Sequence, residues 1–116
     1  MQFYFNPLDK ACKSRTGAIP RGTSVTFRLY WSESGEMPQH LDARFVFWQD
    51  GQERTPLSMN RTENGFCVTL KFNQIGLYFY YFRIGDEYFG CGSLRNGTFM
   101  PQANLVSWQI TVCDEA

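Results

Sequence analysis

Residue types that carry enzyme chemistry are scattered through this sequence. His40 is its single histidine, and it lies in a polar segment where a histidine is more often a solvated side chain than a general base. A glycosidase needs two carboxylates held roughly 5–10 Å apart across one sugar bond, and nothing in the sequence positions such a pair. We therefore expect no catalytic residue in this chain. The carboxylates concerned lie in or beside expected loops: Glu33, Glu36, Asp42, Asp50 and Glu53.

The spacing of the cysteines gives little support for metal or cofactor chemistry. The four positions are Cys12, Cys67, Cys91 and Cys113. None belongs to a Cys-x-x-Cys pair, so we expect neither a zinc site nor a redox motif. The run Gly90–Ser93 lacks the spacing of a phosphate-binding loop, and we expect no cofactor. Two disulfides are the alternative, but in a reducing compartment four free thiols are favoured.

Charge and hydropathy restrict the partners of the chain. Eleven Lys and Arg residues balance eleven Asp and Glu residues, and a neutral chain lacks the basic footprint that nucleic acid or an anionic membrane surface requires. The segment Met1–Pro7 lacks the charged start and sustained apolar run of a secretory leader. No stretch approaches the roughly 20 apolar residues that span a bilayer. We therefore expect a cytoplasmic protein, unless a leader has been removed.

The elements that would position any functional side chain are β-strands. Thr23–Trp31 and Phe66–Phe72 alternate between apolar and polar residues, as strands with one buried face do. Ser107–Cys113 alternates in the same way, and we expect Trp108 to be an anchor of the core. Further strands are expected at Phe3–Phe5, Ala43–Gln49, Pro56–Asn60, Leu77–Ile84 and Tyr88–Phe89. The main expected loops are Asp9–Gly22, Ser32–His40 and Gly90–Pro101.

About seven to eight antiparallel strands at this spacing predict one all-β domain, residues 1–116, with an immunoglobulin-like β-sandwich fold. The Cys-Trp-Cys pattern of antibody domains is absent from the expected strands. The run Gly76-Leu77-Tyr78 fits a tyrosine corner, in which the phenol bonds back to the backbone.

An excess of apolar residues points to a contact surface. Phe45–Trp48 and Leu77–Phe82 are apolar on both faces, although a half-buried strand needs only one such face. The third, sixth and seventh strands of this fold share a sheet, so its outer face is expected to carry an aromatic patch. Such patches usually mark contact surfaces. The candidate residues are Trp48, Phe79, Tyr81 and Tyr88.

Three interpretations of this patch remain open: docking on another domain, stacking of sugar rings, or ring packing with no partner at all. A sugar site needs polar groups that replace the hydrogen bonds lost from water. The polar residues nearest in sequence, Arg44, Gln49 and Arg83, are few. This favours docking.

Two segments resemble a known family. Trp108–Asp114 and Gly76–Ile84 are similar to strands of the N-terminal domain of bacterial α-amylase-family glycoside hydrolases (family thirteen), of the cyclomaltodextrinase or neopullulanase kind. Tyr88-Phe89-Gly90 also looks like an element of that domain. Cys113 departs from the aromatic residue that is usual at its position.

The resemblance implies that residues 1–116 are an excised, non-catalytic domain that packs on the catalytic barrel of the same chain. Such a domain shapes substrate access or contributes to a homodimer, and the catalytic carboxylates of the parent enzyme lie outside this sequence. The alternative is a carbohydrate-binding module for starch, glycogen or maltodextrin, that is, for an α-glucan oligosaccharide. An adhesion-type sandwich unrelated to glycosidases is a third hypothesis.

Overall fold

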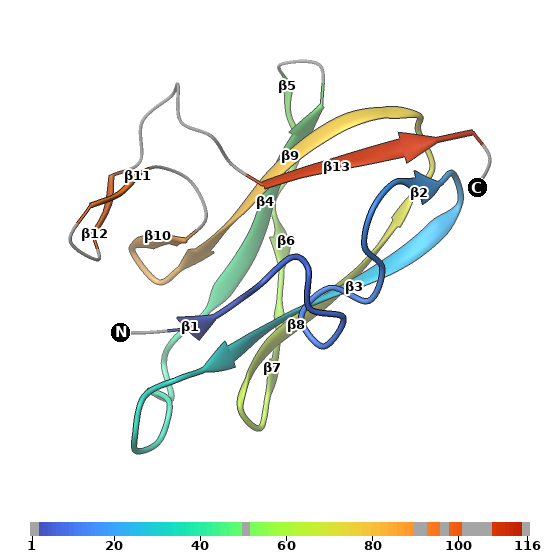
Figure 1. Ribbon diagram of the computed structural model, residues 1–116. Helices are drawn as coiled ribbons and strands as arrows, with labels where there is room; N and C mark the ends of the chain where they lie inside the picture. Colours follow the sequence, from blue (N-terminus) through green and yellow to red (C-terminus); the bar gives the residue numbers. More distant parts are fainter. Residues whose placement is uncertain (1–2, 50–51, 90–92, 96–97, 101–107, 115–116) are drawn as a thin grey trace.

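The chain folds into two packed β-sheets (Figure 1) in a computed structural model that describes residues 3–49, 52–89, 93–95, 98–100 and 108–114. The first sheet has the order β1 (Phe3–Tyr4), β3 (Thr23–Trp31), β8 (Gly65–Phe72) and β7 (Asn60–Thr62). The second has the order β2 (Ile19–Pro20), β13 (Trp108–Cys113), β9 (Gly76–Ile84), β4 (Ala43–Gln49) and β5 (Gln52–Glu53). In this sheet β6 (Leu57–Ser58) also pairs with β4, and β10 (Glu87–Phe89) pairs with β9.

This arrangement confirms the expected sandwich. The order β1-β3-β8-β7 opposite β13-β9-β4 is the A-B-E-D and C-F-G pairing of a constant-type immunoglobulin-like domain. The pairs β3–β8, β4–β9 and β9–β13 are antiparallel, whereas β2 runs parallel to β13 with Ile19 opposite Val112. The two sheets therefore carry one core between them.

Aromatic rings from both sheets fill that core. The ring of Phe27, on β3, lies 4.6 Å from that of Phe45 and 5.1 Å from that of Tyr80, measured between ring centroids. Rings at such distances, tilted or edge-on, pack favourably. The side chains that are fully buried are Cys12, Ile19, Val25, Phe27, Leu29, Phe45, Phe66, Tyr80, Phe82, Ile110 and Val112.

The long strands lie where the alternation predicts them. β3 and β4 have the expected bounds, and β8 and β9 each begin one residue earlier than expected. The short elements were harder to predict: β2 lies inside the expected loop Asp9–Gly22. The hairpin of β11 (Ser93–Arg95) and β12 (Thr98–Met100) lies inside the expected loop Gly90–Pro101. Ser107, the expected start of the last strand, is outside the described residues.

Between β6 and β7 the chain passes from one sheet to the other. β6 pairs with β4, β7 pairs with β8, and Met59 between them is buried. The expected tyrosine corner is confirmed at the next crossing, where the Tyr78 hydroxyl donates to the carbonyl of Gln74 at 3.1 Å. This hydrogen bond ties the start of β9 to the turn that precedes it.

The described cysteines are thiols. Cys12 and Cys67 are free, and the Cys113 thiol lies 3.5 Å from the carbonyl oxygen of Ile19. Cys91 is outside the described residues.

Candidate functional site

The candidate site is the outer face of β4 and β9, the two strands at the centre of the second sheet. Phe45 on β4 and Tyr80 on β9 point into the core, so the alternate residues point away from it. We call these alternate residues the outer face. They are Arg44, Val46 and Trp48 on β4, and Leu77, Phe79, Tyr81 and Arg83 on β9.

The structure brings three of the four predicted aromatic residues together on this face. Trp48 lies directly opposite Phe79, and Val46 lies opposite Tyr81. The Trp48 and Phe79 rings stack with centroids 5.7 Å apart, and the Tyr81 ring meets Trp48 edge-on at 5.8 Å. All three rings are half-buried, so part of each ring is covered by its neighbours.

The apolar strip continues along β9 beyond the rings. Leu77 is 41% exposed, and the adjoining turn residue Ile75 is 49% exposed. Val46, by contrast, is only 3% exposed although it points away from the core, so neighbouring side chains cover it. The accessible apolar surface therefore lies along β9 and around Trp48.

The fourth predicted residue, Tyr88, lies on β10 with its Cα opposite that of Arg83. Its backbone is thus beside the charged end of the outer face. Its side chain lies outside the described part of the structure, so its role in the face stays a prediction.

Polar side chains flank the rings on both sides. Trp48 is opposite Glu53 on β5, and Phe79 is opposite Gln109 on β13, and both polar residues are exposed. Neither neighbour was predicted from the sequence, because Glu53 was expected in or beside a loop and Gln109 comes from a strand distant in the chain. The only available signal was the alternation that puts Gln109 outward.

Gln49, one of the polar residues nearest to the patch in sequence, does not lie on the outer face. It is 3% exposed and points to the same side of β4 as Phe45. Its Nε2 donates to the carbonyl of Ile75 at 3.0 Å, and its Oε1 accepts a hydrogen bond from Arg54 at 3.1 Å. Gln49 therefore fastens the turn before β9 instead of serving the outer face.

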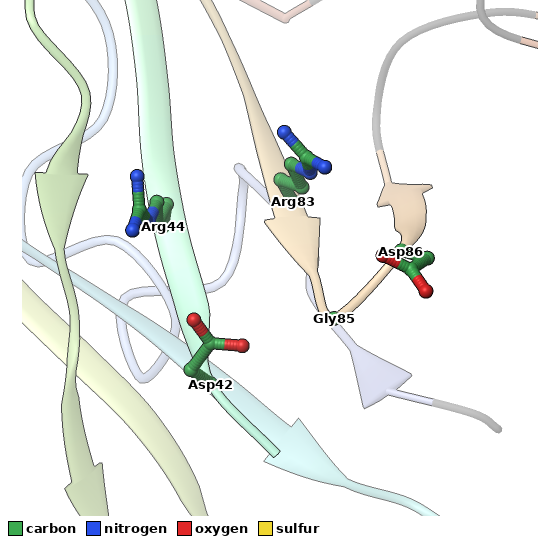
Figure 2. Close-up of a pocket in the computed structure, with 5 residues that line it drawn as sticks. All are labelled: Asp42, Arg44, Arg83, Gly85 and Asp86. Carbon is green, nitrogen blue, oxygen red and sulfur yellow. The ribbon is translucent and has the colours of Figure 1, made fainter.

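A pocket of about 260 Å³ lies at the other end of the face, lined by Asp42, Arg44, Arg83, Gly85 and Asp86 (Figure 2). Arg44 and Arg83 are directly opposite in the β4–β9 ladder. Gly85 and Asp86 form the turn between β9 and β10. Gly85 adopts a φ of 58°, a conformation that favours glycine. The Gly85 amide donates to the Asp42 carbonyl at 2.9 Å, which fixes this turn against β4.

This arrangement is suited to binding. Within the described residues no group of three or more His, Cys, Asp or Glu side chains is placed to hold a metal ion. The titratable groups whose pKa is shifted by burial lie outside this face. Burial lowers the pKa of Lys13 and raises the pKa of Cys12 and Tyr80. For contact with a partner, the outer face offers aromatic rings, exposed aliphatic side chains, and polar side chains on both sides of the rings.

Comparisons with models of protein families, with curated proteins and with solved structures found no match to this chain. Within the described residues no helix is long and apolar enough to cross a membrane.

Proposed function

We propose that this chain is a contact domain, the non-catalytic N-terminal domain of an α-amylase-family glycoside hydrolase, and that its outer face packs on the catalytic barrel of the same chain. The observation that carries the docking role is the strip Leu77–Phe79–Tyr81 beside Trp48, on a sheet whose inner face already fills the core. The core does not require a second apolar face, although stacking of Trp48 on Phe79 stabilises the sheet locally.

The energetics favour covering this strip. Apolar surface removed from water contributes roughly 25 cal/mol per Å², and Leu77 is 41% exposed. The half-buried rings beside it are held by their stacking, so a partner would meet a preorganised surface and order few side chains. In the parent enzyme this contact would shape access to the cleft or contribute to a homodimer.

The reading frame that encodes this chain tests the family part of the proposal, since an α-amylase-type barrel must follow. The docking part is tested by mixing the domain with that barrel, expressed separately, and measuring complex formation by gel filtration and calorimetry. Leu77→Lys and Phe79→Lys should weaken binding strongly, because each places a charge in the contact.

Asn60→Lys is the matched control for this test. Asn60 is exposed on β7, which lies in the other sheet, away from the outer face. Equal binding by the Leu77→Lys and Asn60→Lys variants would show that the outer face is not the docking surface.

A carbohydrate-binding module for starch, glycogen or maltodextrin is the second candidate. Glu53 and Gln109 favour it, because they flank the stacked rings and provide hydrogen-bond partners for sugar hydroxyls. Isothermal titration with maltoheptaose and β-cyclodextrin separates the two functions. A dissociation constant below about 1 mM that is lost in Trp48→Ala would establish this function in place of docking.

A further inference from the structure

The pocket at the charged end of the outer face is lined by two arginines and two aspartates. Asp42 directly precedes β4 and Arg44 lies on it, so the two residues are about 7 Å apart along the extended chain. Within the described residues Arg44 makes no ion pair with Asp42 or with Asp86. The side chains instead surround a space of about 260 Å³ (Figure 2).

The chemistry of this frame restricts the ligand. A guanidinium group only donates hydrogen bonds and a carboxylate only accepts them. An anion would suit Arg44 and Arg83 but would meet two carboxylates, and a cation would meet two guanidinium groups. A hydroxyl group both donates and accepts, so neighbouring hydroxyls can satisfy an arginine and an aspartate together.

The size of the pocket restricts the ligand further. A water molecule takes about 30 Å³ of the liquid, and pockets for drug-sized ligands start at about 300 Å³. A space of about 260 Å³ is thus much larger than one water and suits a small ring.

We propose that this pocket binds a neutral polyhydroxylated molecule of the size of one monosaccharide. Arg44 donates to ligand hydroxyls, Asp42 and Asp86 accept from them, and Arg83 forms the remaining wall. The backbone hydrogen bond from Gly85 to Asp42 holds the two sides of the pocket at a fixed separation. This small-molecule site goes beyond the docking function and needs no second domain.

The test is a titration of the ¹⁵N-labelled chain, followed by NMR, with glucose, galactose and ribose, and separately with inorganic phosphate. At least one sugar should shift the backbone amides of residues 42–44 and 83–86 saturably. Arg44→Gln and Asp42→Asn should each weaken that binding about tenfold, which is the loss expected for one hydrogen bond to a charged group. Arg28→Gln, an exposed arginine on β3 in the other sheet, should leave it unchanged.

Four outcomes would overturn the proposal: no saturable shift with any of the three sugars, shifts with phosphate alone, sugar binding unchanged in both variants, or phosphate binding that is tighter than sugar binding and is strengthened in Asp42→Asn. The last would identify an anion site in which the carboxylates only repel. Phe79→Lys separates this site from docking, because it disrupts the apolar strip and should leave sugar binding intact. Asp42 and Arg44 are both exposed, so each variant is expected to fold, and each tests the site independently.

Discussion

The rings of Trp48 and Phe79 stack across the β4–β9 ladder, with an interplanar angle of 18° and centroids 5.7 Å apart. Their Cα atoms are direct partners in the register, so strand pairing alone brings the two rings together. Cross-strand aromatic pairs of this kind stabilise a sheet by about 0.2–1 kcal/mol. Part of the aromatic excess in the sequence therefore contributes to the fold, whatever else the outer face contacts.

Tyr80→Phe is expected to stabilise the protein by about 1 kcal/mol. The Tyr80 hydroxyl is buried and has no hydrogen-bond partner within the described residues, and an unsatisfied buried hydroxyl costs free energy. Tyr78→Phe is the matched control, because its hydroxyl donates to Gln74 and its loss should destabilise by a similar amount. Urea unfolding at neutral pH measures both, and a destabilised Tyr80→Phe would contradict the prediction.

The same residue predicts a pH dependence. Burial raises the pKa of Tyr80 in the folded protein. In the unfolded chain the pKa of a tyrosine is about 10. Below that pH both states carry the neutral phenol, and above it only the unfolded state ionises readily, so stability falls as pH rises. Tyr80→Phe should show a smaller loss of stability above pH ~10 than the wild type.

Trp108→Ala is expected to destabilise the domain by about 3 kcal/mol. Trp108 lies on the inner side of β13, with its ring centroid 4.7 Å from that of Phe5 and 5.8 Å from those of Tyr80 and Phe82. Because this loss is large, the melting temperature should fall by on the order of 10 °C or more. Gln109→Ala, at the exposed neighbouring position, should melt within a few degrees of the wild type. If both variants had the same melting temperature, the assignment of Trp108 to the inner face of β13 and of Gln109 to the outer face would be wrong.

The alternating strands were predictable because alternation over seven to nine residues identifies one buried face. The segment Thr23–Trp31 shows this most clearly, since Val25, Phe27 and Leu29 are all buried as expected. A two-residue strand such as Ile19–Pro20 has no period to detect. Its position depends on pairing with Val112 and Cys113, which are distant in the chain.

The candidate site was predictable in part for the same reason. The three rings came from two strands that the fold makes neighbours, so Trp48, Phe79 and Tyr81 could be grouped from the sequence. The pocket could not be, because Asp42 and Asp86 meet only through the β4–β9 register and the turn at Gly85. Each of them, taken alone, is an ordinary polar residue beside a loop.

Lys13→Met is expected to stabilise the domain by roughly 1 kcal/mol at neutral pH. Lys13 is 4% exposed, and its backbone forms an isolated antiparallel β-bridge with that of Phe27. The side chain of Phe27 points into the core. Burial lowers the pKa of its amine, which means that the charged form is unfavourable in the folded state. An apolar side chain of similar length removes that cost.

The pH profile of the Lys13→Met variant provides a second measurement. Between the lowered pKa of folded Lys13 and about 10.4 in the unfolded chain, the unfolded state binds more protons, so the wild type gains stability as pH rises. The variant should lack this gain. Lys71→Met, at an exposed position on β8, is the control and should match the wild type, and a Lys13→Met variant that is less stable at neutral pH would refute the prediction.

Gly76→Ala is expected to destabilise the domain by about 2 kcal/mol. Gly76 has a φ of 145°, and a Cβ atom there would lie 2.5 Å from Nε2 of Gln49. That nitrogen donates to the Ile75 carbonyl, so its displacement breaks a hydrogen bond of a buried amide. Gly17→Ala is the matched control, because Gly17 has a φ of 75° with nothing within 4 Å of an added Cβ, and it should show the backbone cost alone.

A double-mutant cycle with Gln49→Ala distinguishes the side-chain clash from the backbone strain at Gly76. Gln49→Ala alone removes the bonds to Ile75 and Arg54 and should destabilise the domain. Once Gln49 is shortened, Gly76→Ala meets no amide, so the double variant should be more stable than the sum of the single changes predicts by about 1 kcal/mol. Strict additivity, measured by urea unfolding, would show that the cost of Gly76→Ala comes from the backbone conformation alone.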